Sequence, residues 1–146
     1  MPRPDDRSDP SLRPLRFEHT FSVEPADIDE RGHVNNIVYL RWVQDVAAAH
    51  WRAAADPTQY RAIAWVAVRH EIDYKHPALP GDRVLARTWV GEAVGARFER
   101  HTELLRALDQ RVLARARTLW CPVDAGSGRP LRITAELRDR FYRPVR

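Results

Sequence analysis

Apolar residues recur along the chain at two different spacings, and the change between them separates a helical part from a sheet part. After residue 36 the apolar positions are three and four residues apart, which predicts one long helix with a single buried face. The residues on that face are Tyr39, Trp42, Val43, Val46 and His50. Proline at position 57 ends this helix, and a short helix or turn is expected at 57–62.

From residue 63 onward the apolar positions alternate with polar ones, which is typical of β-strands that have one buried face. A similar alternation precedes the helix. The predicted strands span 16–23, 63–75, 83–94, 97–107 and 111–123. Only short turns join the last four, which favours antiparallel neighbours. Thr134 is the expected N-cap of a short terminal helix over 134–144.

This order predicts an α+β protein, in which a curved five-stranded antiparallel sheet wraps around one long central helix. With 146 residues the chain has the length of one domain, assigned to 16–146. Residues 1–15 are rich in proline and charge, so a flexible N-terminal tail is expected there.

Charge and composition restrict the range of partners. The net charge is +4, but the arginines are interleaved with acids and form no basic run, so nucleic acid is not expected. An anionic partner such as a phosphorylated cofactor remains open. The longest apolar run, 62–68, is too short to cross a membrane, and a cytoplasmic protein is the default. Cys121 is the only cysteine, which is expected to be a buried structural thiol.

Candidate chemistry gathers in the segment DIDERGHVNNIVYLRW, residues 27–42. Gly32 allows a sharp turn before the helix, and Asn35 or Asn36 can cap the helix. The free backbone N–H groups of the first helical turn then face a carbonyl oxygen that becomes anionic. Asp29 lies a few residues upstream and can return over the same point. Acyl hydrolysis requires at least a general base or nucleophile, such as a carboxylate, and a group that polarises the carbonyl.

Each of these residues also has a simpler structural interpretation. Asp29 can be a turn or capping acid, Asp27 a solvated turn acid, His33 a loop histidine and Tyr39 a packing residue. The histidines and the single cysteine lack the spacing of metal ligands, so no metal is expected.

The segment resembles the signature of the hotdog-fold acyl-CoA thioesterases, the 4-hydroxybenzoyl-CoA thioesterase-like family. The matching string is Asp29, Gly32, His33, Asn36 and Tyr39. The segment YKHPALPGD, residues 74–82, resembles a second motif of that family. The resemblance implies a homodimer or a dimer of dimers with active sites between subunits. It assigns the catalytic carboxylate to Asp29 and the carbonyl-polarising amide to Asn36, with His33 beside them.

Two positions depart from related patterns. Plant acyl-carrier-protein thioesterases have asparagine where this chain has Arg31, which weakens a carrier-protein assignment. Family members often carry glutamate in the middle of the helix, where this chain has Gln44 and Asp45.

The leading hypothesis is hydrolysis of an acyl-CoA to a free acid and coenzyme A, with no cofactor beyond the coenzyme A of the substrate. Asp29 acts as general base or as nucleophile. The predicted substrate-binding residues lie on the helix face and on the strand that follows: Tyr39, Trp42 and Val43 for the acyl chain, Arg69, Lys75 and His76 for the coenzyme phosphates. The alternatives are a hotdog hydratase or dehydratase that uses His33 with Asp29, and a non-catalytic acyl-CoA binding module.

Overall fold

A computed structural model describes residues 10–144 of the chain. Seven strands, three α-helices and one 3-10 helix succeed one another within these residues. In chain order they are β1 (Leu12–Pro14), β2 (Phe17–Ser22), η2 (Pro25–Asp27), α1 (Asn36–Ala54), α2 (Pro57–Ala62), β3 (Ile63–Tyr74), β4 (Arg83–Val94), β5 (Arg97–Arg106), β6 (Val112–Asp124), α3 (Ala135–Asp139) and β7 (Tyr142–Pro144).

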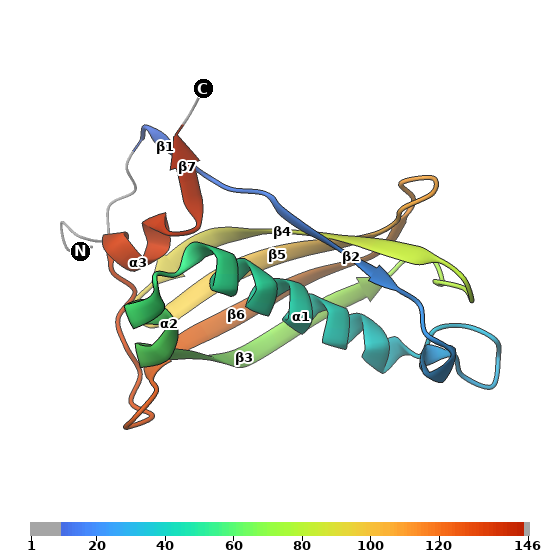
Figure 1. The fold of residues 1–146 in the computed structure, drawn as a ribbon, viewed down its shortest axis with the longest axis horizontal. Coiled ribbons are helices and arrows are strands. Elements are labelled where there is room, and N and C mark those ends of the chain that lie inside the picture. Colours follow the sequence, from blue (N-terminus) through green and yellow to red (C-terminus); the bar gives the residue numbers. More distant parts are fainter. Residues whose placement is uncertain (1–9, 145–146) are drawn as a thin grey trace.

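Five strands form the main sheet in the order β2-β4-β5-β6-β3, and every neighbouring pair is antiparallel. The long helix α1 lies across one face of this sheet, and the shorter α2 follows it at the end near β3 (Figure 1). Helix α1 packs against β2, β4 and β5. Strand β3 is therefore an edge strand that α1 covers only in part.

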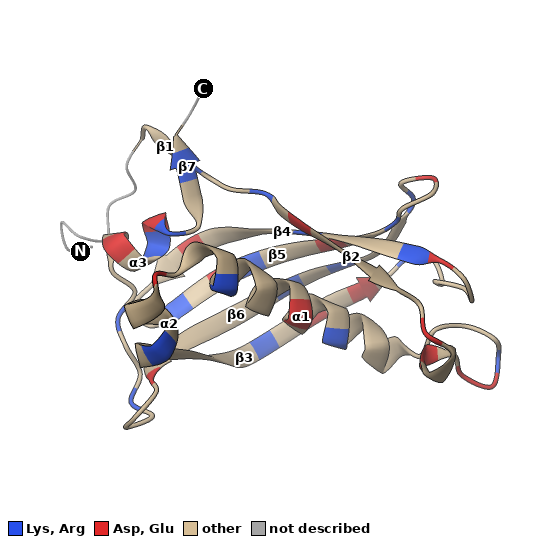
Figure 2. Ribbon diagram, in the orientation of Figure 1, with Lys and Arg blue, Asp and Glu red and all other residues tan. Residues whose placement is uncertain are grey.

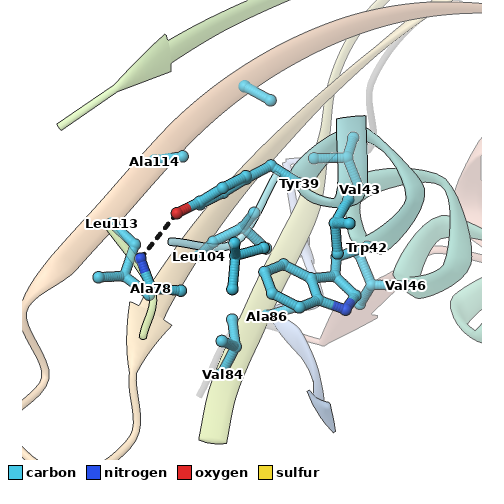
Figure 3. Close-up of a cluster of buried hydrophobic side chains, with 13 residues drawn as sticks. Tyr39, Trp42, Val43, Val46, Ala78, Val84, Ala86, Leu104, Leu113 and Ala114 are labelled. Atoms are coloured by element: carbon cyan, nitrogen blue, oxygen red, sulfur yellow. Dashed lines mark hydrogen bonds between the residues drawn. The ribbon is translucent and has the colours of Figure 1, made fainter. Parts of the chain in front are cut away.

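The apolar face predicted for α1 is buried in the sheet. Trp42, Val43 and Val46 are each at most 1% exposed and pack on Val84 and Leu104 of the strands (Figure 3). Full burial of such a side chain stabilises the fold by about 1.5–3 kcal/mol. This packing holds the N-terminal half of α1, and with it the preceding loop, at a defined place on the sheet.

A second cluster anchors the other end of α1. Trp51 packs there with Phe98 of β5 and with Phe141, which follows α3. The side-chain oxygen of Thr134 accepts a hydrogen bond from Leu137 N at 3.2 Å, so Thr134 is the N-cap of α3, as predicted. The helix ends at Asp139 rather than continuing to residue 144.

The N-terminal segment differs from the expectation of a flexible tail over 1–15. Residues Leu12–Pro14 form β1, which pairs antiparallel with β7 of the C-terminal segment. Residues 1–9 of the expected tail lie outside the described residues. Cys121 also differs from the expectation, because it is half-buried rather than buried.

The face of the sheet turned away from α1 carries charged pairs. Cross-strand ion pairs join Arg117 to Glu99 at 2.6 Å and Arg115 to Glu103 at 3.5 Å. Figure 2 shows acidic and basic positions interspersed along the strands. Such pairs stabilise neighbouring strands only modestly.

Candidate active site

The loop between β2 and α1 folds back on itself before the helix begins. An isolated antiparallel bridge joins Ile28 to Val34, and Asp29 N donates to the carbonyl oxygen of His33 at 2.8 Å. Gly32 has φ +77° at the turn, a conformation that glycine adopts without steric cost. The turn predicted from Gly32 is therefore present, and it places Asp29 and His33 beside the start of α1.

The Asp29 carboxylate organises this loop through one of its oxygens. Oδ1 accepts hydrogen bonds from Arg31 N at 2.9 Å and from His33 N at 3.3 Å. Within residues 10–144, Oδ2 has no hydrogen-bond or ion-pair partner. Oδ1 of Asp29 therefore stabilises the turn, as the structural interpretation expects, whereas Oδ2 can contact a substrate or a water molecule.

The start of α1 presents backbone donors. Asn35 is the N-cap, and its side-chain oxygen accepts from Ile37 N at 3.2 Å. Asn36 is the first helical residue, and within the described residues its N–H donates no hydrogen bond. The positive end of the dipole of a 19-residue helix lies at the same place. An oxygen that gains negative charge is stabilised there.

A cleft of about 370 Å³ brings most of the predicted residues together. It is lined by six of the nine: Asp29, His33, Asn36, Tyr39, Lys75 and His76. The last two come from the segment after β3, whose backbone is held where Lys75 N and His76 N both donate to Leu113 O. The two motifs read from the sequence, residues 27–42 and 74–82, therefore meet in one cleft although they are distant along the chain.

Three predicted residues lie elsewhere. Trp42 and Val43 are 1% and 0% exposed in the core, where an acyl chain does not reach them. Arg69 lies on the exposed side of β3 and forms an ion pair with Glu71 at 2.6 Å. The periodicity therefore predicted a buried helix face correctly. At Trp42 and Val43 the sheet covers this face.

Tyr39 borders the cleft but has a structural task. Its hydroxyl accepts a hydrogen bond from Ala78 N at 2.7 Å, which ties α1 to the segment after β3 (Figure 3). The ring is 2% exposed, and burial raises the pKa of the Tyr39 hydroxyl. The contact fixes the spacing between the two walls of the cleft.

Asp27 is not the solvated turn acid that was expected. It is 4% exposed, accepts a hydrogen bond from Glu24 N at 2.9 Å and forms an ion pair with Arg41 of α1 at 2.9 Å. Its backbone oxygen also accepts from Asn35 N at 2.8 Å. Asp27 therefore fastens the loop that carries Asp29 to the helix.

Five lining residues were not predicted as site residues: Arg31, Val34, Asn35, Tyr74 and Pro77. Arg31 adds a cation to the cleft, and Tyr74 donates its hydroxyl to Asn36 O at 3.2 Å. Tyr74 could have been identified from the sequence, because it is the first residue of the YKHPALPGD motif. Arg31 was noted only as a departure from a related pattern.

Neither a metal centre nor a membrane span is evident in the part of the chain that the structure describes. Across residues 10–144, three or more His, Cys, Asp or Glu side chains do not gather as a group that could hold a metal ion. In the same residues, all helices are too short or too polar to cross a membrane.

Comparison with known proteins now identifies the family. The family model of the thioesterase-like superfamily matches residues 23–141. The chain belongs to this superfamily. The match includes both cleft-forming motifs and four of the five strands of the main sheet, whereas β2 lies before its first residue.

Solved structures of two proteins named as thioesterases and of one CoA-bound protein share the fold. A 1,4-dihydroxy-2-naphthoyl-CoA thioesterase from Synechocystis has a TM-score of 0.74 at 21% identity, over 87% of this chain and 96% of that one. The probable thioesterase YbaW from Escherichia coli has a TM-score of 0.72 at 22% identity, over 85% and 95%. A Staphylococcus aureus protein, SAV2348, in complex with CoA has a TM-score of 0.74 at 14% identity, over 87% and 82%. A comparison with curated protein sequences gave no significant match. The predicted hotdog fold is confirmed.

Proposed function

We propose that this protein hydrolyses an acyl-CoA thioester to a free carboxylic acid and coenzyme A. Membership of the thioesterase-like superfamily supports hydrolysis of a thioester. The observation that carries the finer proposal is that the Asp29 carboxylate borders the same cleft as the N–H of Asn36, which donates no hydrogen bond within residues 10–144.

In the proposed reaction the thioester carbonyl oxygen accepts a hydrogen bond from Asn36 N. Negative charge develops on that oxygen when the carbonyl carbon becomes tetrahedral, and one such donor contributes on the order of 3 kcal/mol to catalysis. The dipole of α1 acts in the same direction. The Asn36 N–H is suited to this role because no acceptor among residues 10–144 binds it.

Asp29 supplies the attacking group in one of two ways. As a general base it takes a proton from water, the hydroxide adds to the carbonyl carbon, and the C–S bond breaks to release the coenzyme A thiolate, which is then protonated. As a nucleophile its Oδ2 adds to the carbon, the thiolate leaves, and water hydrolyses the resulting anhydride. His33 lines the same cleft and is proposed to orient the water or the carboxylate.

The cations at the cleft are proposed to bind the coenzyme phosphates. Lys75, His76 and Arg31 line the cleft, and none of them forms a described ion pair in residues 10–144. Arg69 is left out of this role because it is paired with Glu71. Phosphate binding by such side chains depends on ionic strength.

The same proposal includes a homodimer or a dimer of dimers. The edge strand β3 is 12 residues long and exposes Val66, Val68 and Tyr74 at 48%, 44% and 46%. A long exposed edge presents unpaired backbone groups that a second strand can bond. Pairing of β3 with β3 of a second copy would join two sheets into one. Light scattering is expected to give two or four times the chain mass of 16.9 kDa.

A conservative substitution tests the proposal. Asp29→Asn keeps an oxygen that accepts from Arg31 N and His33 N, but it removes the charge. Glu30→Gln removes a charge from the same loop at an exposed position and serves as the matched control. With a panel of acyl-CoAs and a thiol-detecting reagent, thiol release by Asp29→Asn is expected to fall by at least about 100-fold, whereas Glu30→Gln stays near wild type.

Three results contradict the proposal. They are no thiol release by the wild type, equal release by both variants, or loss of enoyl absorbance without thiol release. The last result would favour the hydratase or dehydratase alternative. Saturable acyl-CoA binding without turnover would favour a binding module.

A further inference from the structure

A second and larger cavity lies under the C-terminal half of α1, apart from the cleft around Asp29. Its volume is about 550 Å³, a size typical of sites for small molecules. Helix α1 and the strands β3 to β6 border it, and six of its fifteen lining residues are aromatic. The aromatic lining residues are Trp51, Tyr60, Trp65, Phe98, Trp120 and Phe141. None of the predicted site residues lines this cavity, but Gln44 and Asp45 do, at the helix positions where family members often carry glutamate.

One charged side chain at the wall of the cavity, Arg100, forms no ion pair within residues 10–144. Arg100 of β5 is 5% exposed and faces α1. Its Nη1 donates to His50 Nδ1 at 2.9 Å and to Thr88 Oγ1 at 3.1 Å, and its guanidinium lies 5.3 Å from the centre of the Phe141 ring. All three partners are neutral, since His50 is buried and burial, followed by the charge of Arg100, lowers its pKa to about 3.

The acids nearest to Arg100 do not neutralise it. Glu99 is the next residue on β5, so its side chain points to the opposite face of the sheet. There it accepts from Arg117 at 2.6 Å and from His101 at 2.7 Å. Asp45 borders the cavity from the exposed side of α1. Within residues 10–144, no carboxylate forms an ion pair with Arg100.

The free donors of Arg100 suit a carboxylate. Within the described residues, Nε and Nη2 donate no hydrogen bond, because both bonds of the guanidinium leave from Nη1. A planar guanidinium binds a carboxylate through two parallel N–H groups. Burial lowers the pKa of Arg100 to about 9, which reflects the unfavourable transfer of its charge from water. An anion in the cavity would offset that cost.

We propose that this cavity binds an amphiphilic carboxylate, with the carboxylate on Arg100 and the apolar body between the indole rings of Trp65 and Trp120. This site goes beyond the proposed function. Arg100 contacts His50, which lies roughly 21 Å along α1 from Asn36, so the carboxylate belongs to a separate ligand and not to the acyl group of the thioester. The proposed dimer interface at β3 lies next to the cavity, because Ile63, Ala64 and Trp65 of β3 are among its walls.

Binding can be measured without turnover. Three tryptophans line the cavity, so occupancy should change their fluorescence. Octanoate is the anionic probe, and octanamide is a neutral probe of similar shape. The wild type is expected to bind octanoate at least about 10-fold more tightly than octanamide, in the range of a hydrogen bond to a charged group. Arg100→Met is expected to abolish this preference, whereas Arg97→Gln, an exposed position on the same strand, retains it.

Folding of the variants provides a second readout. Removal of an unpaired buried charge is expected to leave the melting temperature of Arg100→Met equal to or above that of the wild type. Arg100→Gln keeps a side-chain donor that can face His50. It replaces Arg100→Met in the binding measurement if the methionine variant does not fold. A large fall in melting temperature for both variants, or octanoate binding that both retain, overturns the proposal, because Arg100 would then be a structural residue only.

Turnover separates this inference from the proposed function. Asp29→Asn is expected to lose thiol release but to bind octanoate with the wild-type preference over octanamide, because Asp29 does not line this cavity. Thiol release by a wild type that binds octanoate and octanamide equally refutes the inference but not the thioesterase activity. Octanoate binding that depends on Arg100, without hydrolysis of any acyl-CoA, refutes the proposed function but not the carboxylate site.

Discussion

The proposed oxyanion donor is a backbone group, and one substitution can remove it without breaking the helix. Proline at position 36 has no N–H. Position 36 is the first residue of α1, where proline is well tolerated because the N–H has no partner within the helix. Asn35 has φ −59° and ψ 138°, inside the region that a residue before proline adopts. The chain already has proline at the first position of α2, after Asp56.

The structure sets the expected magnitude. Because the Asn36 N–H donates no hydrogen bond among the described residues, its loss should change the free energy of unfolding by less than about 1 kcal/mol. Loss of one oxyanion donor costs on the order of 3 kcal/mol of transition-state stabilisation, which is roughly 100-fold in rate. Asn36→Ala keeps the N–H and removes only the side chain, so it isolates the backbone contribution.

The assay is thiol release from the best acyl-CoA of the panel, with urea unfolding measured on the same samples. The account predicts that Asn36→Pro is roughly 100-fold slower than Asn36→Ala at similar stability. Equal rates for the two variants would refute the assignment of this N–H to the oxyanion. A folded Asn36→Pro protein is needed for either conclusion, and circular dichroism establishes it.

Two further predictions concern buried polar groups. Tyr39→Phe leaves the N–H of Ala78 without its acceptor, so the free energy of unfolding in urea should fall by about 1–3 kcal/mol. Tyr60→Phe, at an exposed position of α2, is the control. An equal fall in both variants would contradict the role of this hydrogen bond. His50 stays neutral in the folded state because burial and Arg100 lower its pKa to about 3. The unfolded state therefore binds an extra proton below about pH 6.5, and stability falls from there toward pH 3 by up to about 1.4 kcal/mol per pH unit. His50→Gln should reduce that slope between pH 7 and 5, and an unchanged slope would rule out His50 as its source.

The main elements of the fold were predictable because their signals are local. A long helix and five strands each carry a periodic apolar pattern, and the caps Asn35 and Thr134 lie at the helix starts where side-chain acceptors are favoured. The pairing of β1 with β7 was not predictable. Each strand has three residues and a proline, and their contact depends on where the two ends of the chain meet on the finished fold.

The site was predictable as a segment but not as a set of contacts. Periodicity shows that Trp42 and Val43 are buried, yet it does not show whether the sheet or a ligand buries them. The ion pair of Asp27 with Arg41 spans 14 residues and forms only because the loop folds back on the helix. Arg100 occupies an inward position of a strand, where alternation alone predicts an apolar residue.

The most direct test of the account is a crystal structure with a non-hydrolysable acyl-CoA analogue that retains a carbonyl group. The account predicts that the carbonyl oxygen lies about 2.7–3.1 Å from Asn36 N, with Oδ2 of Asp29 directed at the carbonyl carbon or at a water molecule in contact with it. A carbonyl bound outside this cleft, or an Asp29 carboxylate with both oxygens bonded within its own loop, would contradict the account.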